Sequence, residues 1–218
     1  MTTQTLLDRL AHLSTTSLVD ASPVLRILPS RIRPVVTGRP FVGRVVTARA
    51  NRDLMSVIQA LRESGPGDVL VVDAGGEDRA VAGELFGTEA QRRGLAGLVI
   101  LGRSRDTATL ARLSLPVWSI GFAPNAYPAA ALPETGVTLS LDGVPVEPGE
   151  LLVGDDDGLV LGTDAELAAA VDGAEAIEAR EKGLQTRMLD GASLFDVMNY
   201  DEHLAALRDG RPGGLAFG

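Results

Sequence analysis

Charged side chains follow two apolar runs in the middle of the chain. Arg105 and Asp106 come shortly after the run at residues 97–101, and Glu84 lies between that run and an earlier one at residues 69–72. A carboxylate is a hard oxygen ligand of the kind that Mg²⁺ and Mn²⁺ prefer, and a guanidinium can hold a substrate carboxylate by two hydrogen bonds. If the two runs are neighbouring parallel strands, the three side chains converge at the strands' carboxyl ends, where ligands bind in such sheets. The pattern predicts a combined anion and metal site.

Structural roles would explain the same residues. Asp106 could cap a helix that begins at Thr107, because aspartate is a favoured N-cap residue. Glu84 could be a solvated residue on a helix surface. Residue type and spacing alone favour these plainer roles, so both alternatives stay open at the level of the pattern.

Strands and helices alternate around these residues. Runs rich in Val, Leu and Ile predict strands at residues 41–48, 69–72, 97–101 and 116–120. Apolar residues at helical spacing predict helices at residues 53–63, 81–93 and 107–113. We therefore expect a parallel β-α-β core with helical crossovers, and polar loops at its carboxyl edge.

The two ends of the chain have a different character. Leucines at helical spacing predict a helix near residues 6–13, and a short helix follows at Leu18. Runs bounded by Gly, Pro and Asp predict antiparallel strands at residues 137–141, 144–146, 151–153 and 159–161. A long helix capped by Asp164 is predicted for residues 164–187, with a short helix near Phe195 after it. The apolar side of the long helix needs a partner surface, so we expect an oligomer; this side is formed by Leu167, Ala170, Val171, Ala174 and Ile177.

Composition limits the class of protein. The chain has 218 residues, 45% hydrophobic and 4% aromatic, which suits a single α/β domain over residues 1–218 with antiparallel strands and flanking N- and C-terminal helices. A net charge of −9 argues against a nucleic-acid partner, because contact with phosphates needs a basic face. The lack of cysteine excludes thiolate chemistry. We see neither a secretory signal nor an apolar run long enough for a membrane span, so we expect a cytoplasmic location and no membrane partner.

Other polar features predict turns or surface positions. The aspartates at residues 155–157 lack the alternating spacing of a calcium-binding loop, so they predict a hairpin turn. The two histidines, His12 and His203, are expected on the surface, which argues against zinc hydrolases and Ser-His-Asp triads. Trp118 is expected in the core. Tyr127 could reach the site from its loop, but no role is predicted for it.

Several segments, in order along the chain, resemble one known family. They read GDVLVVDAGG at residues 67–76, GEL at 83–85, RGLAGLVI at 93–100, GRSRD at 102–106 and VEPGELLVGDDDGLV at 146–160. With residues 16–20 and 43–48, they resemble the regulator-of-ribonuclease-activity-A-like family, which includes the 4-hydroxy-4-methyl-2-oxoglutarate aldolases. The match spans about residues 14–163, so residues 164–218 form a C-terminal helical extension of the same domain.

The resemblance implies a swivelling β/β/α fold and a homotrimer, or a hexamer made of two trimers. It implies a metal-dependent aldolase that cleaves 4-hydroxy-2-oxo acids to pyruvate and also decarboxylates oxaloacetate. Asp106 would bind the divalent cation, Mg²⁺ or Mn²⁺. Arg105 would bind the small 2-oxo acid substrate.

Further site residues follow from the same resemblance. Gly83, Glu84 and Leu85 match the segment that lines the substrate site, and Glu84 stands where the aldolases keep an acidic residue. In retro-aldol cleavage, Glu84 would take the hydroxyl proton through a water, whereas decarboxylation needs no such base. A glutamate from the C-terminal helix of a neighbouring subunit would complete the site, with Glu181 as the candidate and Glu178 as the alternative.

The segment before the Arg-Asp pair departs from the family pattern at Leu101, Arg103 and Ser104. The extra arginine would favour a more anionic substrate, or would mark a member whose chemistry has drifted. The alternative function is a non-catalytic regulator that binds an RNA-degrading endonuclease, as described for founding members of the family. The lyase hypothesis ranks first because the charged residues of the site are all present. No lysine stands in the motif segments, which argues against a Schiff-base aldolase.

Overall fold

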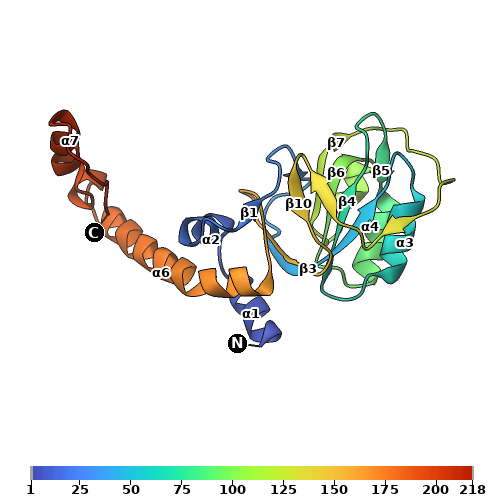
Figure 1. Cartoon of the computed structure of the whole chain (residues 1–218), viewed down its shortest axis with the longest axis horizontal. Helices are drawn as coiled ribbons and strands as arrows, with labels where there is room; N and C mark the ends of the chain where they lie inside the picture. The colour runs from blue at the N-terminus through green and yellow to red at the C-terminus, as the bar shows by residue number, and fades with distance from the viewer. Residues whose placement is uncertain (1, 218) are drawn as a thin grey trace.

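A mixed β-sheet forms the centre of the computed structural model, which describes residues 2–217 (Figure 1). Its strands are β1 (Arg26–Ile27), β2 (Arg33–Pro34), β3 (Phe41–Arg49), β4 (Asp68–Asp73), β5 (Ala80–Ala82), β6 (Gly97–Ser104), β7 (Val117–Phe122), β8 (Glu134–Thr135), β11 (Leu151–Gly154) and β12 (Leu159–Gly162). They lie in the order β1-β12-β11-β3-β4-β6-β7-β2, with β5 beside β6 and β8 beside β3. The strands β9 (Leu139–Leu141) and β10 (Val144–Val146) form a separate antiparallel hairpin.

The central strands β3, β4, β6 and β7 are parallel, which confirms the expected core. Successive residues of β4 alternate between two hydrophobic cores: Leu70 and Val72 face one, and Val69 and Val71 face the other. Helices cover the first face and the β9–β10 hairpin covers the second. A strand buried on both faces needs apolar residues at every position, which explains its continuous apolar run.

Helices cover the sheet and extend it at one end. They are α1 (Thr3–Leu10), α2 (Thr15–Ala21), α3 (Met55–Glu63), α4 (Glu84–Arg92), α5 (Thr107–Leu110), α6 (Asp164–Leu189) and α7 (Tyr200–Arg208), with the 3₁₀ helix η1 (Leu194–Asp196). The helices α3 and α4 contact each other and pack on one face of the sheet. At the other end, α1 and α2 pack with the first half of α6 over β11 and β12 (Figure 1). None of the described helices is long and apolar enough to cross a membrane.

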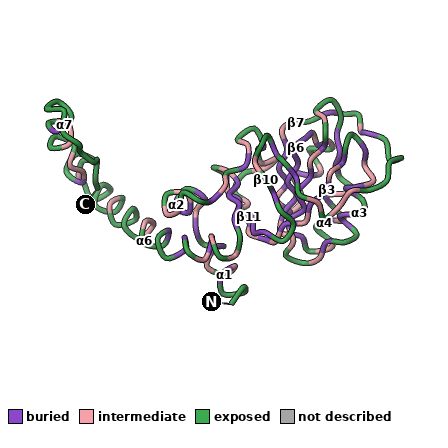
Figure 2. The backbone as a smooth tube through the Cα atoms, in the orientation of Figure 1, coloured by how far each residue is buried: buried purple, intermediate pink, exposed green. Residues whose placement is uncertain are grey.

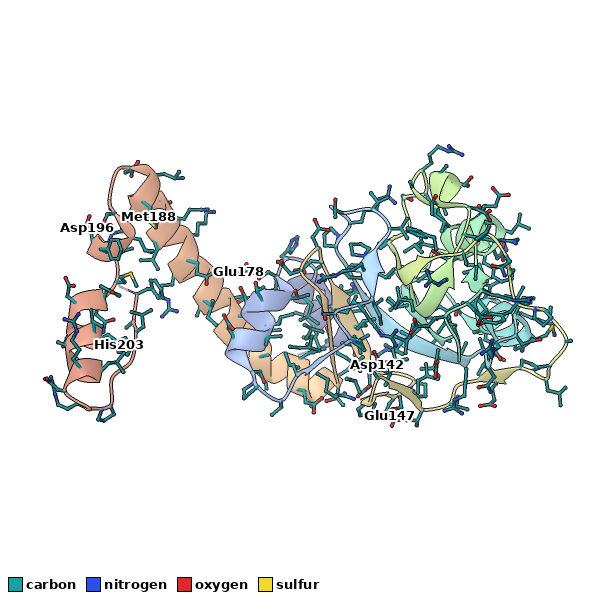
Figure 3. All side chains as sticks on the ribbon, turned by 90° about the horizontal axis from the view of Figure 1, so that it is seen from above. Asp142, Glu147, Glu178, Met188, Asp196 and His203 are labelled. Atoms are coloured by element: carbon teal, nitrogen blue, oxygen red, sulfur yellow. The ribbon has the colours of Figure 1, made fainter. Side chains whose placement is uncertain are left out.

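The long helix α6 is buried only in its first half (Figure 2). It begins with a capping box, in which the side chains of Thr163 and Glu166 each accept the other's backbone N–H. Leu167 and Val171 are fully buried against the N-terminal helices of the same chain. The prediction that this apolar side needs a second chain is therefore wrong for its buried part. Beyond Ile177 the helix projects from the sheet and carries η1 and α7 at its tip (Figures 1 and 3).

Several element boundaries differ from the sequence expectation. Val81 and Ala82 belong to β5 and not to the following helix, because this segment pairs with β6. Strand β6 continues to Ser104, through residues that were expected to form a loop, and α5 ends early at Leu110. Val137 lies outside β9, α6 runs on to Leu189, and the sequence did not predict α7 or the two-residue strands β1, β2 and β8.

Asp53 lies just before α3, and not in its first turn as expected. It is buried, with 5% of its surface exposed, and its carboxylate accepts backbone N–H groups from Met55 at 2.8 Å, Ala130 at 2.7 Å and Ala131 at 3.2 Å. Burial alone would raise the pKa of Asp53, but these hydrogen bonds outweigh it and lower the pKa. Asp53 therefore joins the loop after β7 to the start of α3.

Candidate active site

A small cleft lies where β5 passes into α4 and β6 passes into α5. It has a volume of about 130 Å³, well below the roughly 300–1,000 Å³ of pockets for drug-sized ligands. The residues Gly83 to Leu85, Arg105 and Asp106 all line it, beside apolar side chains such as Leu54 and Phe86. The fold thus brings these five sequence-predicted residues together in a space suited to a small ligand.

Gly83 lies closely against the Arg105-Asp106 pair. A Cβ atom at this position would lie 2.4 Å from Oδ2 of Asp106 and 2.8 Å from Cγ of Arg105. Its φ of −156° is open to other residues, so contact and not backbone conformation requires glycine here. Glycine therefore lets the Arg105-Asp106 pair approach the start of α4.

Asp106 caps a helix, but not the helix that follows it in the sequence. It occupies the N-cap position of α5 with a left-handed φ of 58°, yet its side chain makes no capping bond there. Instead, Oδ2 accepts the backbone N–H of Glu84 at 3.0 Å, at the N-terminus of α4. The capping alternative was right about the kind of contact and wrong about the helix. Oδ1 has no hydrogen-bond partner among residues 2–217.

The backbone of Arg105 is fixed by a hydrogen bond, whereas its guanidinium is partly exposed. Its backbone N–H donates to the carbonyl of Ala82 at 3.0 Å, which fixes the end of β6 against β5. Nε lies 3.4 Å from Oδ2 of Asp106, and 41% of the side chain is exposed. The terminal guanidinium nitrogens have no other partner in the described chain, so they are free to bind an anion.

Glu84 opens α4 with an exposed carboxylate. Oε2 accepts a hydrogen bond from the hydroxyl of Thr109, on α5, at 3.1 Å. The sequence analysis did not single out Thr109, and only its position three residues after Asp106 could have suggested it. Leu85, beside Glu84, is 73% exposed at the rim of the cleft.

The first turn of α4 offers unpaired backbone donors. Asp106 accepts the N–H of Glu84, whereas the N–H groups of Leu85 and Phe86 have no acceptor among the described residues. Such groups at a helix N-terminus attract anions, because they carry the positive end of the helix dipole. A substrate carboxylate would find donors both here and on Arg105.

The side chains around Asp106 fit only a sparsely held cation. No group of three or more histidine or acidic side chains that could hold a metal occurs among the described residues. Asp106 offers one unpaired oxygen on a side chain that is 34% exposed. Mg²⁺ is commonly held by one or two carboxylates, with waters and substrate oxygens as its other ligands. The donor set therefore fits a hydrated Mg²⁺ or Mn²⁺ that the substrate helps to hold.

Arg103 is engaged in the structure of the sheet edge. Its guanidinium donates to the carbonyl oxygen of Glu77 and, at 3.1 Å, to that of Phe122. Ser104 is fully buried, and its hydroxyl lies 3.1 Å from that of Ser119 on β7. These contacts do not support the suggestion that Arg103 selects a more anionic substrate.

Glu178 and Glu181 lie far along α6, which projects from the end of the molecule opposite α4 (Figures 1 and 3). Glu178 accepts the backbone N–H of Ser14 at 2.7 Å, at the start of α2. Glu181 is exposed and makes no ion pair or hydrogen bond within residues 2–217. Glu181 is therefore available to contact another molecule, but it lies too far away to reach the cleft of its own chain.

The remaining sequence expectations have mixed outcomes. Asp155 forms a turn, accepting the N–H of Asp157 at 3.1 Å, and it also accepts the N–H of Thr15 at 2.7 Å. Trp118 is buried and His12 is exposed, as expected. The expectation for His203 is wrong in part, because its Nδ1 is buried and finds no hydrogen-bond partner among the described residues.

Known proteins resemble this chain in sequence. The family model for RraA-like proteins, described as Aldolase/RraA, matches residues 15–161. A 4-hydroxy-4-methyl-2-oxoglutarate aldolase of Thermus thermophilus is 36% identical over 148 residues, which cover 67% of this chain and 90% of the relative.

Solved structures give the same result. The RNA-processing inhibitor RraA of Thermus thermophilus has a TM-score of 0.64 at 36% identity, over 68% of this chain and 91% of that one. An unusual member of the RNase ES inhibitor RraA protein family from Streptomyces coelicolor has a TM-score of 0.72 at 27% identity, over 84% of this chain and 96% of that one. The second likeness extends beyond residue 163, since the residues before α6 make up only about three quarters of this chain. The chain is a member of the RraA-like family.

Proposed function

We propose that the chain is a divalent-metal-dependent carbon-carbon lyase that cleaves small 4-hydroxy-2-oxo acids to pyruvate and also decarboxylates oxaloacetate. One observation carries the proposal: two carboxylates, helix-terminal N–H groups and a guanidinium surround a single small cleft, and the N–H groups and the terminal guanidinium nitrogens have no partner within residues 2–217. The relative in Thermus thermophilus that is named as an aldolase supports lyase activity at the level of the family.

The substrate would bind by its 2-oxo acid end. Its carboxylate would accept hydrogen bonds from the N–H groups of Leu85 and Phe86 and from the guanidinium of Arg105. The remainder of the substrate would then extend toward the open rim of the cleft, near Glu84. This pose places the bond between C3 and C4 of the substrate beside a carboxylate.

Glu84 would act as the base of the aldol cleavage. As its carboxylate removes the proton from the C4 hydroxyl, directly or through a water, C4 becomes the carbonyl carbon of the released product and the bond between C3 and C4 breaks. The electron pair of that bond forms a double bond between C2 and C3, and the 2-oxo oxygen takes the negative charge. The product side is a pyruvate enolate, which takes a proton from water to give pyruvate. A cation bound at Asp106 would supply positive charge next to the developing enolate oxygen. Oxaloacetate loses carbon dioxide through the same enolate, but it has no hydroxyl proton to give up.

We also propose a trimer, or a pair of trimers, in which Glu181 of one subunit lies near the cleft of another. Two observations support this assembly: Glu181 is exposed on a projecting helix and has no partner within residues 2–217, and Leu85 is exposed at the rim of the cleft. A second chain would cover Leu85 and would exclude water from the site.

Pyruvate release from 4-hydroxy-4-methyl-2-oxoglutarate and from oxaloacetate tests the proposed function. Excess chelator should abolish both reactions and Mg²⁺ should restore them, and undiminished turnover in chelator would remove the metal from the proposal. Asp106→Ala should lower both reactions strongly, because it removes the cation ligand. Glu84→Gln should lower aldol cleavage by about a hundred- to ten-thousand-fold, the usual worth of a general base, and should largely spare decarboxylation. Glu89→Gln is the matched control, because Glu89 lies on the same helix but pairs with Arg92 outside the cleft.

A second candidate function is inhibition of an RNA-degrading endonuclease. One related structure is described as an RNA-processing inhibitor and another as an unusual member of the RNase ES inhibitor RraA protein family. The chain carries a net charge of −9, which could mimic the phosphates of RNA. If no 2-oxo acid is turned over with Mg²⁺ or Mn²⁺, while the protein slows RNA cleavage by such an enzyme, this function replaces the lyase.

A further inference from the structure

Three loops at the carboxyl edge of the sheet meet at one carboxylate. Asp78, in the loop between β4 and β5, accepts a hydrogen bond from the hydroxyl of Tyr127, in the loop after β7. The two carboxylate oxygens of Asp78 also accept hydrogen bonds from Nη2 of Arg52, in the loop after β3, at 3.0 and 3.1 Å. The guanidinium carbon of Arg52 lies 5.6 Å from the centre of the Tyr127 ring, within the range of a cation–π contact. Asp78, Tyr127 and Arg52 together are called the Asp78 anchor below.

Tyr127 is the buried member of the Asp78 anchor. Only 5% of Tyr127 is exposed, and its ring packs in the core between the sheet and the helices. A buried hydroxyl needs a partner, and Asp78 is the partner that the chain supplies. By contrast, about half of Asp78 and of Arg52 is exposed, and an ion pair of that kind contributes little by itself. The hydrogen bond from Tyr127 is therefore the firm part of the anchor.

Backbone hydrogen bonds connect the segment that carries Tyr127 to the cleft. The N–H of Ala80 donates to the carbonyl of Asn125 at 2.9 Å, and the N–H of Tyr127 donates to the carbonyl of Ala80 at 3.1 Å. Strand β5 is therefore held between β6 and the segment that carries Tyr127. The strand itself lines the cleft and ends at Ala82, directly before Gly83. A shift of β5 would move the first turn of α4 and its N–H groups.

The segments around the Asp78 anchor adopt uncommon backbone conformations. Asn51 and Arg52 have φ values of 48° and 66°, a left-handed region that non-glycine residues rarely occupy. A Cβ atom on Gly76 would lie 2.5 Å from the hydroxyl oxygen of Tyr127, so the loop before Asp78 also approaches the tyrosine closely. Such strain persists where surrounding contacts over-determine the conformation, often next to functional sites.

We infer that Tyr127 is a positioning residue of the site: through Asp78 it fixes β5, and through β5 it fixes the N-terminus of α4 at which the substrate carboxylate docks. The docking step rests on the proposed function, whereas the effect on β5 does not. The tyrosine does not line the cleft, so it acts through this chain of contacts and not by touching the substrate.

Tyr127→Phe isolates the contact, because it removes the hydroxyl and keeps the buried ring. Tyr200→Phe is the matched control, since Tyr200 is the only other tyrosine of the chain and lies on α7, remote from the cleft. Amide hydrogen exchange at Ala80 and Glu84, whose N–H groups are hydrogen-bonded to Asn125 and Asp106, should speed up about ten- to hundredfold in Tyr127→Phe, the factor expected when a hydrogen bond to a charged group is lost. Unchanged exchange, relative to Tyr200→Phe, would overturn the inference.

Binding of oxalate in the presence of Mg²⁺, measured by calorimetry well below the unfolding temperature, tests the link to the site. Oxalate resembles the enolate of pyruvate and needs no turnover. Its affinity should fall about tenfold in Tyr127→Phe, with a smaller fall in Asp78→Asn, which keeps an acceptor for the tyrosine. If exchange speeds up while oxalate affinity stays at the level of the control, Tyr127 stabilises the loop without positioning the site, and the inference is wrong. If the wild-type protein turns over no 2-oxo acid, the proposed function falls, while the exchange experiment still decides whether Tyr127 fixes β5.

Discussion

Replacing Gly83 by alanine would test whether the Arg105-Asp106 pair works at the point where it meets α4. The backbone φ of −156° accommodates alanine, so the substitution acts through the contacts of one added methyl group. That methyl would lie 2.4 Å from Oδ2 of Asp106, 2.8 Å from Cγ of Arg105 and 3.2 Å from Nε of Arg105. Both side chains must move for the variant to fold.

The size of the effect follows from these distances. An ordinary contact needs about 3.4 Å, so Oδ2 of Asp106 must retreat by about 1 Å, which breaks its 3.0 Å hydrogen bond to the N–H of Glu84. A misplacement of this size can cost about a hundredfold in rate. The added methyl should also cost roughly 1–3 kcal/mol of stability, which in a chain of this length lowers the unfolding temperature by about 2–12 °C.

The assay is pyruvate release from 4-hydroxy-4-methyl-2-oxoglutarate and from oxaloacetate with Mg²⁺, at a temperature where both proteins are folded. Gly83→Ala should lower kcat/KM about a hundredfold for both substrates, since it disturbs the anion and cation groups that the reactions share. Gly65→Ala is the control, because the nearest atom to its Cβ, Oδ2 of Asp68, lies at 3.8 Å. A Gly83→Ala protein with the expected loss of stability but with wild-type kcat/KM would refute the placement of the site.

Three further predictions concern stability and assembly. Asp53→Ala leaves three backbone N–H groups without their buried acceptor, so urea unfolding should show a loss of about 2–4 kcal/mol; a loss below about 1 kcal/mol would contradict this role. The pKa of Asp78 is lowered, chiefly by the hydrogen bond from Tyr127, and the pKa of Tyr127 is raised by burial and then by Asp78. The contribution of Asp78 to the free energy of unfolding is present above its unfolded pKa of about 4 and is lost as pH falls through the lower folded pKa. The contribution of Tyr127 is present below about pH 10 and is lost as pH rises through the higher folded pKa. The stability difference between wild type and Tyr127→Phe should therefore be flat from pH 5 to 9 and shrink outside that range, and a steady slope across neutral pH would show that other groups control it. Sedimentation at micromolar concentration should give a trimer or hexamer, and a monomer would remove the proposed role of Glu181 across an interface.

The core of the fold was predictable because its strands are buried on both faces. Residues 69–72 and 97–101 are apolar at every position, and such a continuous apolar run is typical of a strand that is buried on both faces. The order of the elements then fixed which loops share the carboxyl edge. The sequence therefore predicted that Glu84, Arg105 and Asp106 share one cleft, although Glu84 lies 21 residues before Arg105.

The errors lie where distant contacts overrule local patterns. Val81 and Ala82 lie just before a helical pattern of residues, but the edge of β6 offers their segment a partner, so they form a strand. The strands β1, β2 and β8 have two residues each, too few to show any periodicity. The apolar side of α6 correctly indicated a packed helix, but periodicity cannot say whether its partner belongs to the same chain or to a second one.

The backbone of Asp106 explains why the site could only be completed in three dimensions. An aspartate in the usual N-cap conformation would turn its carboxylate onto α5, as the sequence suggested. The left-handed φ of 58° instead accompanies a bond from the N–H of Glu84 on another helix. This conformation is strained, and the contact with α4 compensates for it only because glycine at position 83 leaves room. Gly83, Glu84 and Asp106 thus depend on one another: the glycine admits the carboxylate, the carboxylate takes the first N–H of α4, and the next two N–H groups remain for a ligand.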